Sequence, residues 1–122
     1  MSKEPIFWHE KLDAYQCSLQ SCSRIQERIL DAKPKAAAAG HLDRALESIL
    51  NNIVNGNSTW SADVRRQCFN VAYGSSLECA ACLDVLCTKH LIAPTLSREE
   101  KLELRRIAQM LVGLVRRRSH EV

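Results

Sequence analysis

Cysteine and histidine are the side chains in this sequence that could hold a metal ion or supply a nucleophile. Cys79 and Cys82 are three residues apart, and Cys87 and His90 follow them. A structural zinc site needs about four such ligands that converge on one point. If this stretch is one helix, Cys87 lies about 140° around its axis from Cys82. The sequence has no second pair at metal-binding spacing. We therefore expect no metal or cofactor and cysteines that pack as small hydrophobic residues, with a reactive or disulfide-forming thiol as the alternative.

A catalytic centre cannot be assembled from the remaining polar residues. No spacing combines a nucleophile with a base and an orienting acid, and the sequence has no glycine-rich phosphate loop. Glu78 stands out among the carboxylates because it lies among the small residues of a predicted helix. We expect Glu78 to be partly buried and paired with Arg44 or another cation. The sequence therefore predicts no catalytic residue.

Clustered arginines give the stronger chemical signal. The guanidinium fork suits phosphate because it forms two parallel hydrogen bonds. The candidate nucleic-acid-binding residues are Arg65, Arg66, Arg98, Lys101, Arg105, Arg106, Arg116, Arg117 and Arg118. Arg106 and Arg117 are about three helical turns apart, so we expect both on one side, with Arg65 and Arg66 beside them if their helices are neighbours. The alternative is a solvated face that complements the helix dipole. Trp60 is the only aromatic residue close to such a cluster.

Length and composition predict one helical domain spanning residues 1–122. The chain is 46% hydrophobic and 25% charged, which is typical of a globular protein. It has four glycines and three prolines, and it lacks runs of alternating β-branched residues. No run of 18 apolar residues and no signal peptide occur, so we expect a cytoplasmic protein with no membrane segment. The net charge of +3 permits an acidic partner such as RNA.

Hydrophobic periodicity predicts helices at about residues 5–31, 41–55, 62–90 and 98–118. The first stripe is Trp8, Leu12, Tyr15, Leu19, Cys22 and Ile29, and the second is Leu42, Leu46, Ile49 and Ile53. The third is Val64, Cys68, Val71, Ser75, Cys79, Cys82 and Leu86. The fourth is Leu104, Ile107, Leu111, Leu114 and Val115. Because the connections are short, we expect an all-α fold: an antiparallel, up-down-up-down four-helix bundle.

Capping residues and glycines predict where these helices begin and end and where two helices approach closely. Gly56 is expected to end the second helix, and Ser61 to cap the third. Ser97 and Glu100 have the spacing of a capping box that starts the fourth helix. Gly74 lies in the middle of the third helix, where glycine is unfavourable, so we expect a close backbone contact that excludes a side chain.

Two motifs in the second and third helices resemble a known family. Arg44-Ala45, Ser48-Ile49, Asn52-Ile53 and Gly56 resemble the pattern R-A-x-x-S-I-x-x-N-I-x-E-G. Ala72, Gly74-Ser75 and Glu78 are similar to A-x-G-S-L-x-E. The chain thus resembles the four-helix-bundle family of ribosomal-RNA intervening-sequence proteins and accessory variability determinants of diversity-generating retroelements. It departs from the pattern at Asn55, where the family has an acidic residue, and at Ser76, where it has leucine.

The resemblance implies a protein that is not an enzyme and that forms a closed ring, typically a homopentamer. Members of the accessory branch are basic and bind nucleic acid together with their reverse transcriptase; the other branch has no settled function. Ser48, Asn52, Gly56, Gly74, Ser75 and Glu78 form a structural motif in which Ser48 and Asn52 would tie the second helix to the following turn. Leu50 and Val54 lie off the main stripe and leave apolar surface for a ring. We expect an RNA-binding reverse-transcriptase partner; the alternative is an intervening-sequence-type assembly protein without nucleic-acid binding.

Overall fold

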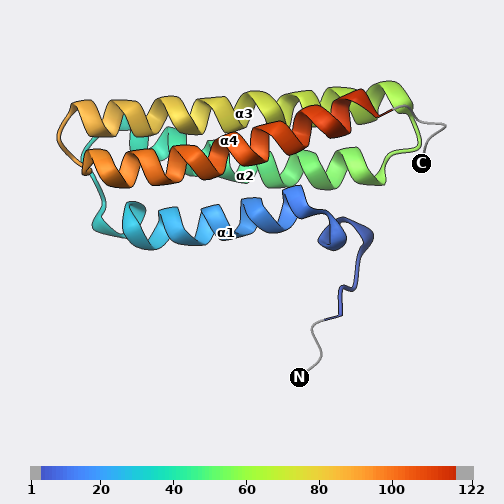
Figure 1. Ribbon diagram of the computed structural model, residues 1–122, viewed down its shortest axis with the longest axis horizontal. Coiled ribbons are helices and arrows are strands. Elements are labelled where there is room, and N and C mark those ends of the chain that lie inside the picture. The colour runs from blue at the N-terminus through green and yellow to red at the C-terminus, as the bar shows by residue number, and fades with distance from the viewer. Residues whose placement is uncertain (1–3, 118–122) are drawn as a thin grey trace.

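The computed structural model describes residues 4–117. Its four α-helices are α1 (Asp13–Arg28), α2 (Ala37–Ser58), α3 (Ala62–Thr88) and α4 (Pro94–Arg116). Two short 3-10 helices, η1 (Trp8–Lys11) and η2 (Leu30–Ala32), flank α1. No strand occurs among the described residues. The helices run back and forth along one long axis, as Figure 1 shows, which confirms the predicted all-α four-helix bundle.

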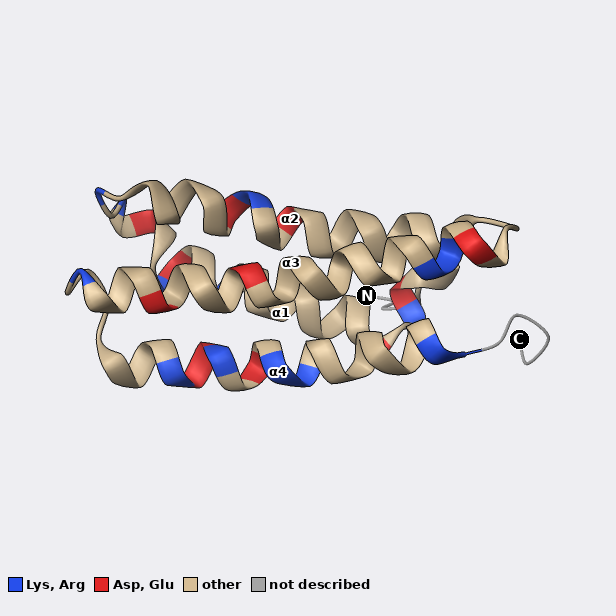
Figure 2. Ribbon diagram, turned by 90° about the horizontal axis from the view of Figure 1, so that it is seen from above, with Lys and Arg blue, Asp and Glu red and all other residues tan. Residues whose placement is uncertain are grey.

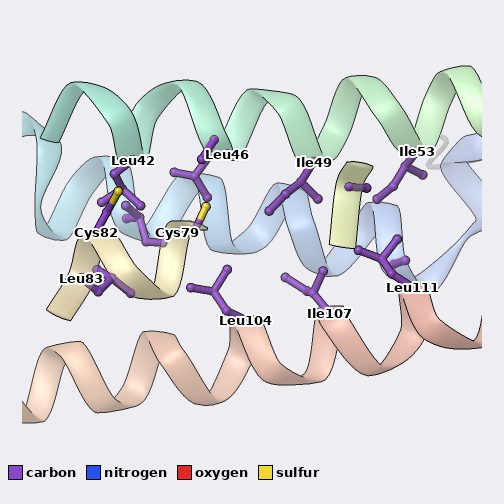
Figure 3. Packing of buried hydrophobic residues seen from close by; sticks show 14 of the residues in the cluster. Leu42, Leu46, Ile49, Ile53, Cys79, Cys82, Leu83, Leu104, Ile107 and Leu111 are labelled. Carbon is purple, nitrogen blue, oxygen red and sulfur yellow. The ribbon is translucent and has the colours of Figure 1, made fainter. Parts of the chain in front are cut away.

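The core lies between α2, α3 and α4, and α1 completes the bundle by packing on α2 and α4. Figure 3 shows apolar side chains from these helices pointing toward one another. The largest fully buried residues include Ile25, Leu42, Ile49, Ile53, Phe69, Leu83, Leu86, Leu104, Ile107 and Leu111. The stripes predicted for the second and fourth helices are confirmed as the buried faces of α2 and α4, with Val115 half-buried.

The N-terminal prediction is wrong in two respects. The first α-helix starts at Asp13, since the preceding residues form an extended stretch and the short helix η1. Trp8 is 75% exposed and Leu19 is 45% exposed, so neither belongs to the buried stripe. The buried face of α1 is Ala14, Ser18, Ser21 and Ile25. Three of these four buried residues are small, and a search for large apolar residues therefore misses this face.

The stripe predicted for the third helix is correct in its second half only. The second half, from Ser75 to Leu86, is buried as predicted. Val64 and Val71 are 43% and 51% exposed, and Phe69 and Ala72 are buried instead. A large aromatic ring thus replaces the β-branched residues on the buried face of the first half of α3.

Two predicted helix ends are wrong, and each has a packing reason. Helix α2 continues through Gly56, which is buried; a Cβ atom there would lie 2.8 Å from Cε1 of Phe69. Gly56 therefore makes room for Phe69 and does not end the helix. Helix α4 starts at Pro94, which suits the first helical turn, so Ser97 and Glu100 are buried within the helix and form no capping box. The cap at Ser61 is confirmed, because its Oγ accepts the Val64 amide at 3.2 Å.

Among the described residues, α3 alone is long and apolar enough to be a candidate membrane span, by length and composition only. Its buried residues contact α2 and α4, as in the central helix of a bundle. Only 33% of the apolar window of α3 is buried, so packing within the bundle accounts for part of its apolar composition.

Candidate nucleic-acid interface

A short, hydrogen-bonded turn sets the geometry at the end of the bundle where α2 meets α3. The Ser61 amide donates to Oγ1 of Thr59 at 3.2 Å, and the Ser61 hydroxyl caps α3. Trp60 lies between these two residues, and its side chain is fully exposed, at 103%. The turn therefore holds an indole ring out into solvent from an ordered backbone.

Arg65, Arg66 and Arg117 come together at this same end. They line one small surface hollow with Ala62, Leu114 and Val115, because α3 starts where α4 ends. Figure 2 shows Lys and Arg positions at the start of α3 and at the end of α4. We call Trp60, Arg65, Arg66 and Arg117 the basic end. The expected side-by-side placement of the two arginine clusters is thus confirmed for Arg117.

The arginines of the basic end are weakly neutralised. The Arg65 guanidinium lies 5.5 Å from the centre of the Phe69 ring, and its Nε atom is buried with no hydrogen-bond partner among the described residues. Arg66 Nη1 lies 3.5 Å from an Asp63 carboxylate oxygen. The side chains of Arg66 and Asp63 are mostly exposed, so solvent screens their attraction. Among the described residues, neither Arg65 nor Arg66 is paired with a buried carboxylate.

The remaining candidate residues lie elsewhere on α4. Arg98, Lys101 and Arg105 line a groove of about 640 Å³ between α3 and α4, whose apolar lining includes Leu77 and Leu102. Lys101 Nζ lies 2.6 Å from an oxygen of Asp84. Arg106 does not line this groove. Its Nη1 atom lies 4.0 Å from a carboxylate oxygen of Glu103. Arg116 is exposed at the helix end, and Arg118 lies outside the described residues. The predicted cations therefore form more than one group.

Another charge cluster, which sequence analysis missed, lies at the opposite end. The Glu100 side chain is only 1% exposed, and its carboxylate meets Arg24 Nε at 3.1 Å and Arg28 Nη1 at 2.8 Å. Arg28 also reaches Glu99 at 2.6 Å, and this hydrogen bond raises the pKa of Arg28 above its ordinary value. We call Arg24, Arg28, Glu99 and Glu100 the paired end. The available signal was Pro94, which marks an earlier helix start and makes Glu100 an interior residue.

The family-like motif holds α2 against α3. The hydroxyls of Ser48 and Ser75 lie 2.8 Å apart, and the Asn52 amide donates to the Ser48 carbonyl oxygen at 2.9 Å. The motif thus ties α2 to α3, and the expected tie from α2 to the turn is wrong. A methyl group added at Gly74 would have no neighbouring atom within 4 Å, so the predicted close contact there is also wrong. Glu78 is exposed, which contradicts its predicted burial.

The cysteines are buried to different degrees and form no disulfide. Cys79 and Cys82 belong to the core, as predicted. Burial raises the pKa of the Cys79 thiol from its ordinary 9.0 to about 12, so it stays protonated at neutral pH. Within residues 4–117, no group of three or more His, Cys, Asp or Glu side chains could hold a metal ion.

Comparison with known proteins decides the family. A family model described as 23S rRNA-intervening sequence protein matches residues 10–113. The chain belongs to this family. The solved structure of a protein of unknown function from the S23 ribosomal protein family of Bacteroides thetaiotaomicron has the same fold, with a TM-score of 0.76 at 18% identity. The match covers 85% of this chain and 96% of that one. No curated protein matches the chain.

Proposed function

We propose that this family member is a non-catalytic RNA-binding protein of the cytoplasm whose basic end contacts phosphates. The observation that carries the proposal is the convergence of Arg65, Arg66 and Arg117 around one exposed hollow. Arg117 is far from the other two in sequence, yet the packing of α4 on α3 brings all three to one surface. Arginine binds phosphate through paired hydrogen bonds, and such contacts displace counterions, so binding should weaken steeply with salt.

A charge-reversal pair tests this proposal. Arg65→Glu with Arg117→Glu should weaken binding to a structured RNA tenfold or more, which corresponds to about 1.4 kcal/mol. The matched control is Lys35→Glu with Lys89→Glu, since both lysines are exposed. Lys35 precedes the start of α2 and Lys89 follows the end of α3, away from the turn that joins these two helices. Fluorescence anisotropy at several salt concentrations gives the affinities. Equal losses of RNA affinity in the two variants would overturn the proposal. So would a wild-type protein that binds neither structured nor random RNA at low salt.

We extend the proposal to a protein partner, the reverse transcriptase of a diversity-generating retroelement. Support comes from the two motifs around Ser48 and Gly74-Ser75, which resemble those of the whole family, the accessory branch included, and do not separate its branches. Neighbouring genes give the first test: a reverse transcriptase with template and variable repeats supports the extension. A location inside a ribosomal RNA gene contradicts it. Co-purification of tagged protein with that reverse transcriptase is the second test.

Self-assembly is a second proposed property, and exposed apolar surface favours it. Ile6, Phe7 and Trp8 are 84%, 64% and 75% exposed on the segment that precedes α1. Leu77 and Leu102 are 50% and 41% exposed at the groove between α3 and α4. Large exposed apolar patches typically mark interaction sites. We propose that the N-terminal segment of one copy docks in the groove of the next.

Charge and symmetry support this choice of occupant. The groove is lined by Arg98, Lys101 and Arg105 against one carboxylate, Asp84. The segment and the residues that follow it carry Glu4, Glu10 and Asp13 against one cation, Lys11, so the two surfaces have small net charges of opposite sign. A contact between two different surfaces of identical chains is head-to-tail, and it closes into a ring if its rotation permits. The proposed ring is a homopentamer, as the family resemblance implies.

Mixing two defective variants tests the head-to-tail contact. Trp8→Ser with Phe7→Ser removes the segment's apolar surface, and Leu77→Glu with Leu102→Glu disables the groove. Each variant alone should be monomeric by native mass spectrometry, whereas an equimolar mixture should form one heterodimer through the remaining intact pair of surfaces. Val64→Ser, at an exposed valine outside the groove, is the control. A monomeric wild-type chain, or a mixture that forms no heterodimer, would contradict the contact.

A further inference from the structure

Trp60 occupies an unusual position for a large aromatic residue. Its side chain is 103% exposed, although the turn that carries it is fixed by hydrogen bonds at Thr59 and Ser61. A hollow of about 440 Å³ adjoins the ring and is lined by residues 57–62 and Arg65. An exposed indole beside a concave, partly polar surface offers a flat apolar face for a ligand and an N–H group for a hydrogen bond.

Arg65 connects this hollow to the arginines of the basic end. It lines both the hollow beside Trp60 and the smaller hollow shared with Arg66 and Arg117. The Phe69 ring lies against its guanidinium, and its buried Nε has no hydrogen-bond partner within residues 4–117. A cation is therefore positioned between an aromatic surface on one side and further cations on the other.

We propose that Trp60 and Arg65 form a binding subsite for single-stranded RNA, in which an unpaired base stacks on the indole. Arg65 would bind the adjoining phosphate, and Arg66 and Arg117 the phosphates beyond it. This inference rests on the proposed RNA-binding function and adds the form of RNA that is recognised. Proteins that bind single strands combine a basic track with aromatic side chains on which bases stack.

The geometry favours single strands over duplexes. In a duplex the bases are stacked on each other, so an aromatic side chain on a protein surface cannot reach their faces without unstacking them. Sequence-specific and stacking contacts to RNA accordingly target loops, bulges and ends. A protruding turn such as 59–61 can reach an unpaired base, and the indole of Trp60 is fully open to solvent there.

Affinity measurements with three probes test the subsite. The probes are fluorescein-labelled oligouridylate and oligoadenylate single strands and a blunt RNA duplex of equal length. Trp60→Ala should weaken binding of both single strands about tenfold, because it removes the surface on which one base stacks, and leave the duplex affinity nearly unchanged. Trp60→Phe should restore part of the loss, because a phenyl ring still stacks. Leu91→Ala is the control, since Leu91 is also an exposed apolar residue but follows α3 at the other end of the bundle and does not line the proposed docking groove.

Tryptophan fluorescence gives a readout that a merely structural role would not produce. The chain has two tryptophans, so Trp8→Phe leaves Trp60 as the only indole. Saturating oligoadenylate should quench its emission, as stacking on a base does, whereas the duplex should not. Circular dichroism melting of Trp60→Ala should match wild type, because the side chain makes little contact with the bundle.

Three outcomes separate this inference from the proposed function. If RNA binds and depends on Arg65 and Arg117, but Trp60→Ala has no effect and the fluorescence does not change, the subsite is wrong and the proposed function stands. If no RNA binds at all, both are wrong. If Trp60→Ala dissociates an oligomer and leaves RNA affinity unchanged, Trp60 is a protein contact and the subsite is again overturned.

Discussion

The two ends of the bundle use arginine in opposite ways. At the paired end, Arg24 and Arg28 surround a carboxylate that is 1% exposed, with contacts of 3.1 and 2.8 Å. At the basic end, Arg65 faces an aromatic ring, and Arg66 meets its carboxylate neighbour at 3.5 Å on exposed side chains. Arginine whose charge is satisfied inside the protein holds helices together. At the basic end no buried carboxylate among the described residues is paired with Arg65 or Arg66, and the proposed function uses these cations to bind phosphate.

The largest expected effect comes from removing both cations of the paired end. Arg24→Gln with Arg28→Gln leaves the Glu100 carboxylate buried without a partner. Breaking a buried ion pair in this way typically costs about 3–5 kcal/mol. The free energy of unfolding, measured by urea denaturation, should fall by an amount in that range.

The matched change at the basic end is Arg65→Gln with Arg117→Gln. Because neither arginine neutralises a buried carboxylate, this variant should stay within about 0.5 kcal/mol of wild type in the same assay. Similar losses at the two ends would show that both sets of arginines are structural, and the contrast between the ends would be wrong.

The second effect concerns the packing beneath the basic end. Gly56→Ala places a methyl group 2.8 Å from Cε1 of Phe69, whose ring is completely buried. Overpacking of this kind costs about 1–3 kcal/mol. Thermal and urea unfolding should both show the loss, and RNA affinity should fall if the shift reaches Arg65, which lies over the same ring.

Gly74→Ala is the natural control for that substitution. No atom lies within 4 Å of the position that its methyl group would take. Replacing a mid-helix glycine by alanine then gains about 0.5–1 kcal/mol from helix propensity. A Gly56→Ala variant as stable as Gly74→Ala would mean that Phe69 moves aside without cost.

Sequence patterns predict the fold well because three of its determinants are local. Apolar periodicity in α2 and α4, the Ser61 cap and the short connections each depend on neighbouring residues. Sequence patterns fail where a residue far away in the sequence determines the local structure. Gly56 has the local features of a helix end, although Phe69 is what requires a glycine there.

The candidate site is predictable only in part, for the same reason. Sequence spacing finds the arginine clusters but cannot show that Arg65 and Arg117 line one hollow, since that depends on how α3 and α4 pack. Glu100 is misplaced by its local pattern because a serine and a glutamate three residues apart also fit a capping box. Its partners Arg24 and Arg28 lie more than 70 residues away in sequence, at separations of 76 and 72.

A third, smaller effect should appear at alkaline pH. Cys79 lies in the half of α3 nearer the paired end, and burial raises the pKa of its thiol from 9.0 to about 12. Between these values the unfolded chain loses a proton that the folded chain keeps, so rising pH favours unfolding. Relative to Cys79→Ala, the wild-type free energy of unfolding should fall by about 1.4 kcal/mol between pH 8 and pH 10.

The comparison with Cys79→Ala cancels titrations that both proteins share. The variant also loses packing at every pH. The test therefore uses only the pH dependence of the difference in unfolding free energy between wild type and Cys79→Ala. A constant difference from pH 8 to pH 10 would show that the Cys79 thiol is more accessible to water than its burial indicates.

The smallest expected effect tests whether the ion pairs of the paired end are strong because their atoms are close together or because Glu100 is buried. Lys101 and Asp84 lie 2.6 Å apart, as close as Arg28 and Glu99. Their side chains are 41% and 58% exposed, however, so water screens the charges and the pair should contribute only about 0.2–1 kcal/mol. A double-mutant cycle with Lys101→Gln and Asp84→Asn measures this coupling without the solvation terms of each side chain. The coupling should fall further in molar salt, where the screening length shrinks to about 3 Å. A coupling as large as the loss from Arg24→Gln with Arg28→Gln would show that short contacts alone stabilise the paired end, and that the burial of Glu100 adds nothing.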